Sequence, residues 1–200
     1  MDMERFHRAV GKILAEKNFE NADEANAFLS ELTKGRTIDE IIAEVEESSE
    51  EQAQYLAGRA MESDSLAEIV SLCREALQLD PHCIDALFIE AGLKARSPRD
   101  YVTRLRSIVR DAERRFGAQY MEENRGHFWG MVETRPYMRA RQSLVMALEE
   151  TAQISEAIAE CEGMLDLNPN DNQGMRDLLR GYYLQTGNIE GVRRLNKDYP

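Results

Sequence analysis

Several signatures of catalysis, metal binding and secretion are missing from this 200-residue sequence. It contains no CxxC, no HExxH and no Cys/His cluster, which argues against a structural zinc site. Glycine-rich phosphate loops of the GxGxxG and GxxxxGK[ST] types are absent as well. The charged start, MDMERFHRAVGKIL, has no apolar signal-peptide core, and no apolar run approaches the roughly 18 residues of a membrane span. We therefore expect a cytoplasmic protein that needs no cofactor or metal and contacts no membrane.

Cysteine is scarce, and its placement also excludes a disulfide framework. Cys73, Cys83 and Cys161 are odd in number, lie far apart and fall within helical patterns. This usage is typical of reduced thiols in a cytoplasmic protein. We predict that all three are core residues.

The charge pattern narrows the choice of partners. The net charge of −12 argues against nucleic acid and anionic membranes, both of which are negative themselves. Residues 1–50 carry a charge of −7, whereas residues 101–150 carry +2 and all their bases are Arg. Five of these, Arg104, Arg106, Arg110, Arg114 and Arg115, follow one predicted helix without interleaved aromatics, which does not favour RNA binding. A basic middle on an acidic chain indicates an acidic partner, although a solvated helix face that balances nearby acids explains it equally well.

Apolar residues recur at helical spacing along the whole chain, which predicts an all-α protein. Capping pairs mark several starts: Asn21 with Glu24, Thr37 with Glu40, Ser48 with Glu51, and Ser65 with Glu68. Ser97 followed by Pro98 marks the start of a long helix, and Gly117 a break after it. The expected helices are 3–17, 22–33, 38–45, 50–62, 65–79, 84–95, 98–115, 136–150, 155–166, 172–185 and 188–197.

Two stretches, CREALQLDPHCIDAL and CEGMLDLNPNDNQGM, end in the same way. When each Pro is placed at position 32 of a 34-residue unit, small and apolar residues fall where a tetratricopeptide repeat requires them. We predict a right-handed tetratricopeptide-like superhelix with a concave groove. Residues 1–47 form an N-terminal helical cap, and 48–200 form the repeats, with a non-repeat insert at about 117–135, in one continuous structural unit.

Four segments carry a more specific resemblance: HFWGMVETRPYMRAR, LNPNDNQGMRDLL, EANAFLSEL and EEQAQYL…ALQLDPHCIDAL. Together they resemble the bacterial tetratricopeptide proteins related to the suppressor-of-tumorigenicity-seven family. The resemblance implies a scaffold or interaction role instead of a reaction, and a chain that continues beyond Pro200. Asp177 and Gly181 depart from the pattern, because the family implies more apolar residues there; the last helix is thus expected to pack less tightly.

The predicted groove is the first candidate for a working surface. Groove-facing repeat positions hold Arg139, Gln142, Arg176, Arg180 and Tyr183, together with Met146, Glu149 and Gln173. The three arginines suit a carboxylate or an acidic peptide, and Tyr183 would add a flat apolar contact. Alternatively, these arginines pair with Glu149, Glu150 and Asp177 of the same chain. We predict a non-catalytic protein–protein interaction module that binds a protein or peptide in this groove.

The insert supports an alternative, a small-ligand site or an active site formed by His127, Trp129, Glu133 and Arg135. His127 and Glu133 could act as a general acid and base, but no nucleophile or phosphate loop accompanies them. The insert can equally be an ordered crossover, in which Phe128 and Trp129 fill the stack and Glu133 pairs with Arg. A third alternative is a homodimer through the C-terminal end of the repeats.

Overall fold

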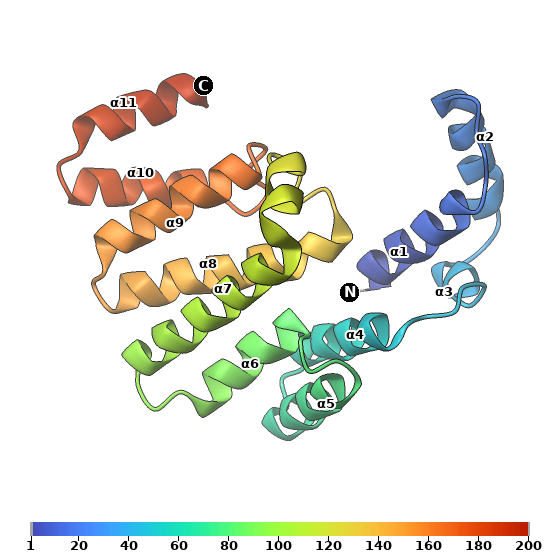
Figure 1. Cartoon of the computed structure of the whole chain (residues 1–200), viewed down its shortest axis with the longest axis horizontal. Coiled ribbons are helices and arrows are strands. Elements are labelled where there is room, and N and C mark those ends of the chain that lie inside the picture. Colours follow the sequence, from blue (N-terminus) through green and yellow to red (C-terminus); the bar gives the residue numbers. More distant parts are fainter. Residues whose placement is uncertain (1, 200) are drawn as a thin grey trace. The chain divides into compact units, whose positions relative to one another are not determined.

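A computed structural model describes residues 2–199, and in this range every regular element is helical. The chain divides into two compact units, the first ending at Ala86 and the second starting at Leu87. The division falls inside α6 (Ile84–Lys94), which therefore contributes to both units (Figure 1). The prediction of an all-α protein is confirmed, whereas the tetratricopeptide-like superhelix stays a prediction.

The first unit contains five complete helices (Figure 1). They are α1 (Asp2–Ala15), α2 (Ala22–Thr33), α3 (Ile38–Ile42), α4 (Ser49–Glu62) and α5 (Leu66–Leu79). Its core lies between α4 and α5, which pack along their length. Small side chains allow this close approach, and the buried positions include Ala53, Ala57, Ala60, Cys73 and Ala76.

The predicted helix starts in this unit are confirmed by their capping contacts. Thr37 and Ser48 form complete capping boxes with Glu40 and Glu51. The side chain of Asn21 accepts a hydrogen bond from the backbone N–H of Glu24, at 3.0 Å. Local sequence therefore determines where these helices begin.

The predicted boundary at residue 47 lies inside the first unit. There, α1 packs on α3 and α4. The guanidinium of Arg5 donates two hydrogen bonds to Glu47, both at 2.6 Å. Lys12 pairs with Glu51 at 2.5 Å and donates to the carbonyl of Glu46 at 2.9 Å. These contacts connect the predicted cap to the start of α4.

The second unit continues from α6 with α7 (Pro98–Glu123), a 3₁₀ turn (Val132–Thr134), α8 (Arg135–Glu150), α9 (Ile154–Leu167), α10 (Met175–Gln185) and α11 (Ile189–Asp198). From α7 onward, each α-helix packs on the next one in the sequence (Figure 1). Asp177 and Gly181, which depart from the family pattern, are both exposed on α10 and so lie outside the core.

Gly117 breaks α7, as predicted. Its φ of 80° and ψ of 155° are strongly disfavoured for residues with a Cβ, so glycine is required here. The helix that begins at Pro98 is thus interrupted next to Arg115, as predicted, and a further helical segment that was not predicted runs from the kink to Glu123. The predicted insert therefore begins as helix.

The three cysteines are all buried and, within residues 2–199, none forms a disulfide, which confirms that they are core residues. Within residues 2–199, none of the helices has the length and apolar character needed to cross a membrane.

Candidate functional site

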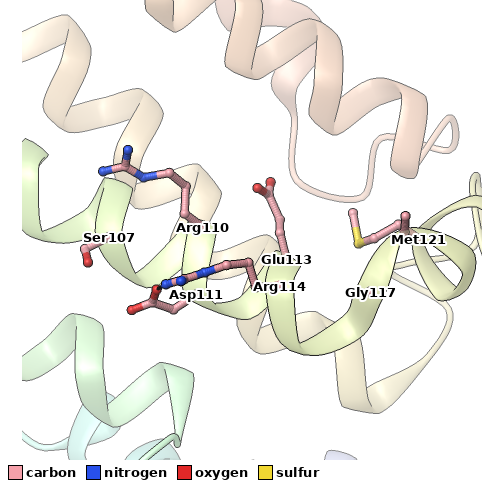
Figure 2. A pocket seen from close by; sticks show the side chains of 8 residues that line it. Ser107, Arg110, Asp111, Glu113, Arg114, Gly117 and Met121 are labelled. Carbon is pink, nitrogen blue, oxygen red and sulfur yellow. Dashed lines mark hydrogen bonds and ion pairs between the residues drawn. The ribbon is translucent and has the colours of Figure 1, made fainter.

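An open hollow of about 880 Å³ runs along one face of α7 in the second unit. It is lined by Ser107, Arg110, Asp111, Glu113, Arg114, Gly117, Ala118 and Met121 (Figure 2). Most of these residues follow each other at intervals of three or four, so they share one side of the helix. We call this surface the α7 cleft. Its volume lies within the roughly 300–1,000 Å³ that is typical of ligand sites.

The cationic group of the α7 cleft that is not neutralised by an acid is Arg110. Its side chain is exposed, and its Nε–H donates to the carbonyl of Arg106 at 3.2 Å. Among the described residues, no carboxylate forms an ion pair with Arg110. Arg114, by contrast, is paired with Asp111 on the same turn. Arg110 is thus available for a carboxylate from outside the chain.

Glu113 connects the α7 cleft to a buried polar network. Its carboxylate accepts a hydrogen bond from the hydroxyl of Tyr137 at 2.8 Å. That hydroxyl in turn accepts from Nη1 of Arg141 at 3.4 Å. Nε and Nη2 of Arg141 donate to one oxygen of Glu160, at 2.9 and 2.7 Å. The network joins α7, α8 and α9 through side chains.

The charges in this network are compensated, as the burial of Arg141 requires. Arg141 is only 8 % exposed, and it lies 5.7 Å from the ring centre of Tyr137. Burial, opposed by the positive charge of Arg141, raises the pKa of Tyr137 well above its usual value. The hydroxyl of Tyr137 therefore stays protonated and keeps donating to Glu113.

A glycine in the middle of α9 makes room for Arg141. A Cβ on Gly163 would lie 2.6 Å from Nη2 of Arg141, far inside contact distance. Glycine normally weakens a helix interior, so its presence here is explained by the close approach of the guanidinium.

The insert is organised around Phe128, which is completely buried. Its ring lies 6.0 Å from that of Phe116 and 5.8 Å from that of Tyr137, both in edge-on arrangements. The hydroxyl of Thr134, also fully buried, donates to the Phe128 carbonyl. Phe128 thus packs between the helices, as predicted by the alternative in which the insert is an ordered crossover. It needs no ligand to hold its place.

The four residues of the predicted insert site lie in the segment around the buried Phe128 side chain. Trp129 is half-buried; its carbonyl accepts from Nε of Arg135 at 2.9 Å, and the Arg135 guanidinium lies 5.8 Å from its ring centre. His127 and Glu133 are exposed. The carbonyl of His127 accepts from Gly130 at 2.9 Å and closes the turn. The structure gives no contact between His127 and Glu133, and an active site in the insert stays a prediction.

The predicted groove residues on α10 already have partners in the chain. Arg176 pairs with buried Asp171 at 2.8 Å, and its guanidinium lies 5.0 Å from the ring centre of Tyr199. Arg180 pairs with Asp177 at 2.9 Å and donates to Asn196 at 3.2 Å. The pairing of Arg180 with Asp177 agrees with the intramolecular alternative.

Tyr183 requires a correction. It is 2 % exposed, and its hydroxyl donates to Glu162 and accepts from Arg194. Its ring packs over Gly191 of α11, so it offers no flat apolar surface to a partner. The cause is the small residue at 191, which allows the ring to enter the α10–α11 interface.

Of the predicted groove residues on α8, Arg139 and Gln142 are half-buried, whereas Met146 and Glu149 are exposed. Gln142 exchanges hydrogen bonds with Gln173, donating to its carbonyl at 3.3 Å and accepting from its amide at 3.0 Å. Arg139 also interacts within the protein. The predicted groove set is therefore engaged to a large extent in holding α8, α10 and α11 together.

The α7 cleft was missed at the sequence level. The arginines of this helix were interpreted as a poor RNA surface and as part of a basic middle that indicates an acidic partner, but they were not assigned to a binding surface. Their spacing with Ser107, Ala118 and Met121, at repeated intervals of three, four or seven, was the available signal.

Across the described residues, no three His, Cys, Asp or Glu side chains gather in an arrangement that could hold a metal ion. No family model, curated protein or solved structure matches this chain. The resemblance to bacterial relatives of the suppressor-of-tumorigenicity-seven family stays a prediction.

Proposed function

We propose that this chain is a non-catalytic protein-interaction module and that its working surface is the α7 cleft. The observation that carries the proposal is Arg110, an exposed guanidinium that has no carboxylate partner among residues 2–199 and lies beside a hollow of about 880 Å³. A carboxylate of the partner would complete a charge-assisted pair there. Ala118, Met121 and the stem of Arg110 would receive apolar side chains.

The partner of such a cleft is an acidic segment with one apolar face. The acidic part would pair with Arg110, and Arg114 could leave Asp111 to join it, because both members of that pair are largely exposed. A helix or an extended segment fits along α7 better than a compact small molecule does. Such recognition uses a row of anchors along one secondary-structure element.

The test uses peptides selected from a random phage-displayed library against the whole protein. We expect the selected peptides to be acidic and to bind less tightly at higher salt. Arg110→Glu with Arg114→Glu should weaken binding about tenfold or more, which corresponds to about 1.4 kcal/mol. Arg193→Glu is the matched control, because this arginine of α11 is exposed and forms only a long pair with Glu190, at 3.6 Å.

Peptides that bind the double variant as tightly as the parent protein would refute the α7 cleft as the working surface. Selection of peptides that respond to changes at Arg176 and Arg180 instead would return the site to the predicted groove on α10.

A further inference from the structure

Helix α2 is a formed helix whose apolar side is only partly covered, because its apolar residues are half-buried. It places Ala25, Phe28, Leu29 and Leu32 on one side, at the spacing i, i+3, i+4 and i+7. None of its residues is buried, and within residues 2–199 it packs closely on no other helix. Its apolar side is touched by Phe19, whose ring lies 5.5 Å from that of Phe28.

Local contacts at its N-terminus help to hold the helix in shape. Asn21 caps its N-terminus, and the carboxylate of Glu24 accepts from the backbone N–H of Glu20 at 2.8 Å. A 12-residue helix is marginal in water by its own propensity, so these caps contribute much of its stability. A preformed helix with four aligned apolar residues has the form of a ligand for a groove.

The flanks of α2 are acidic. Asp23, Glu24 and Glu31 are all exposed, and the lysine at its C-terminal end, Lys34, pairs with Glu31 at 3.5 Å. The groove that receives this helix must therefore supply positive charge at its edge. Within the described residues, the α7 cleft offers such a charge at Arg110.

The dimensions of the two elements agree. With a rise of 1.5 Å per residue, α2 is about 18 Å long. The lining of the α7 cleft covers about 15 Å of helix from Ser107 to the kink at Gly117, and Ala118 and Met121 extend it beyond the kink. The helix can lie lengthwise in the cleft with an acidic side chain near Arg110 and its apolar side toward Ala118 and Met121.

We propose that the occupant of the α7 cleft is helix α2 of a second copy of this chain. The inference rests on the proposed function of the α7 cleft and identifies the partner as the protein itself. Two copies that exchange α2 reciprocally form a closed dimer with two identical contacts. Each single contact is small, and the second becomes intramolecular once the first has formed.

The test measures molar mass by light scattering over a concentration series of the full chain. The unchanged protein is expected to reach twice the monomer mass of 22.9 kDa. Phe28→Asp with Leu32→Asp removes the apolar side of α2, and Arg110→Glu with Arg114→Glu replaces both arginines of the α7 cleft with acids. None of these four residues is buried, so both variants should fold, as circular dichroism can verify.

Each variant alone should be monomeric, because one has no competent helix and the other no competent cleft. An equimolar mixture should form a one-to-one heterodimer through one α2–cleft contact, at higher protein concentration than the unchanged dimer requires, since the α2 of the cleft variant still fits the cleft of the α2 variant. The return of a dimer in the mixture is expected only for a contact between α2 and the α7 cleft. A general loss of solubility in the variants would not produce it.

Three outcomes overturn the inference: a monomer at all concentrations, dimers of either variant alone, or a mixture that does not complement. A dimer lost instead in Leu184→Asp with Ile189→Asp would place the contact at the exposed end of α10 and α11. If the protein is monomeric but selected acidic peptides still bind the α7 cleft, the inference fails while the proposed function stands.

Discussion

The substitution Gly163→Ala tests whether the buried network is held as the structure describes. In a helix interior, alanine is more favourable than glycine by about 0.5–1 kcal/mol. By propensity alone, the change should stabilise α9. The new Cβ, however, would lie 2.6 Å from Nη2 of Arg141.

Arg141 can avoid the new methyl group only by moving its guanidinium. The movement breaks the bond from Nη2 to Glu160, which is 2.7 Å long. A hydrogen bond between charged groups contributes about 1.5–3 kcal/mol. The loss exceeds the gain in propensity, so we expect Gly163→Ala to destabilise the second unit by about 1 kcal/mol. Arg141→Ala removes the obstacle, and in that background Gly163→Ala should stabilise by about 0.5–1 kcal/mol.

Urea unfolding followed by the fluorescence of Trp129 is the appropriate assay. Trp129 is the single tryptophan, and it lies in the second unit, so its signal reports on that unit. The four proteins of the double-mutant cycle give the coupling between the two positions. A stabilising Gly163→Ala in the unchanged background, or the same effect in both backgrounds, would refute the reasoning.

Two further predictions concern groups outside this network. Burial raises the pKa of Cys83 and Cys161 to about 12, so neither thiol should react with a disulfide reagent at pH 8 until the protein is unfolded; rapid reaction in the native protein would contradict this. The hydrogen bond from Arg5 lowers the pKa of the Glu47 carboxyl below 4.5. The ionised carboxylate therefore stabilises the folded protein above pH 4.5, and this stabilisation is lost as the pH falls through the lowered pKa. Glu47→Gln should therefore lower the free energy of unfolding by about 1 kcal/mol at pH 7 and by little in acid. Unfolding followed by circular dichroism measures both values, and an equal loss at the two pH values would contradict the assignment.

Helix starts could be predicted from the sequence because they depend on local chemistry. The capping box of Thr37 and Glu40 involves residues three apart, and both of its hydrogen bonds join these two residues. Gly117 is a similar case, since the need for a positive φ is a property of the residue itself. The glycine does not determine whether helical turns resume beyond it, so the segment that runs to Glu123 was not predicted.

The candidate site could not be predicted because it depends on which partners each arginine meets. Arg110 and Arg176 are the same residue type on helices of similar pattern. In the folded chain, Arg176 meets the buried carboxylate of Asp171, five residues earlier, whereas Arg110 meets a backbone carbonyl. A periodicity argument assigns a face to each residue. It does not say which charges on that face are already neutralised.

Tyr182 and Tyr183 show how fine this distinction is. The repeat spacing places Tyr182 and Gly191 at core positions, and both are buried. Neighbouring residues on a helix point about 100° apart, so the same spacing directs Tyr183 toward the groove. A Cβ at Gly191 would lie 2.9 Å from the Tyr183 ring, so the absence of that one atom allows the ring to turn inward. At a position that faces a small residue on the neighbouring helix, the helical pattern therefore does not distinguish core from surface.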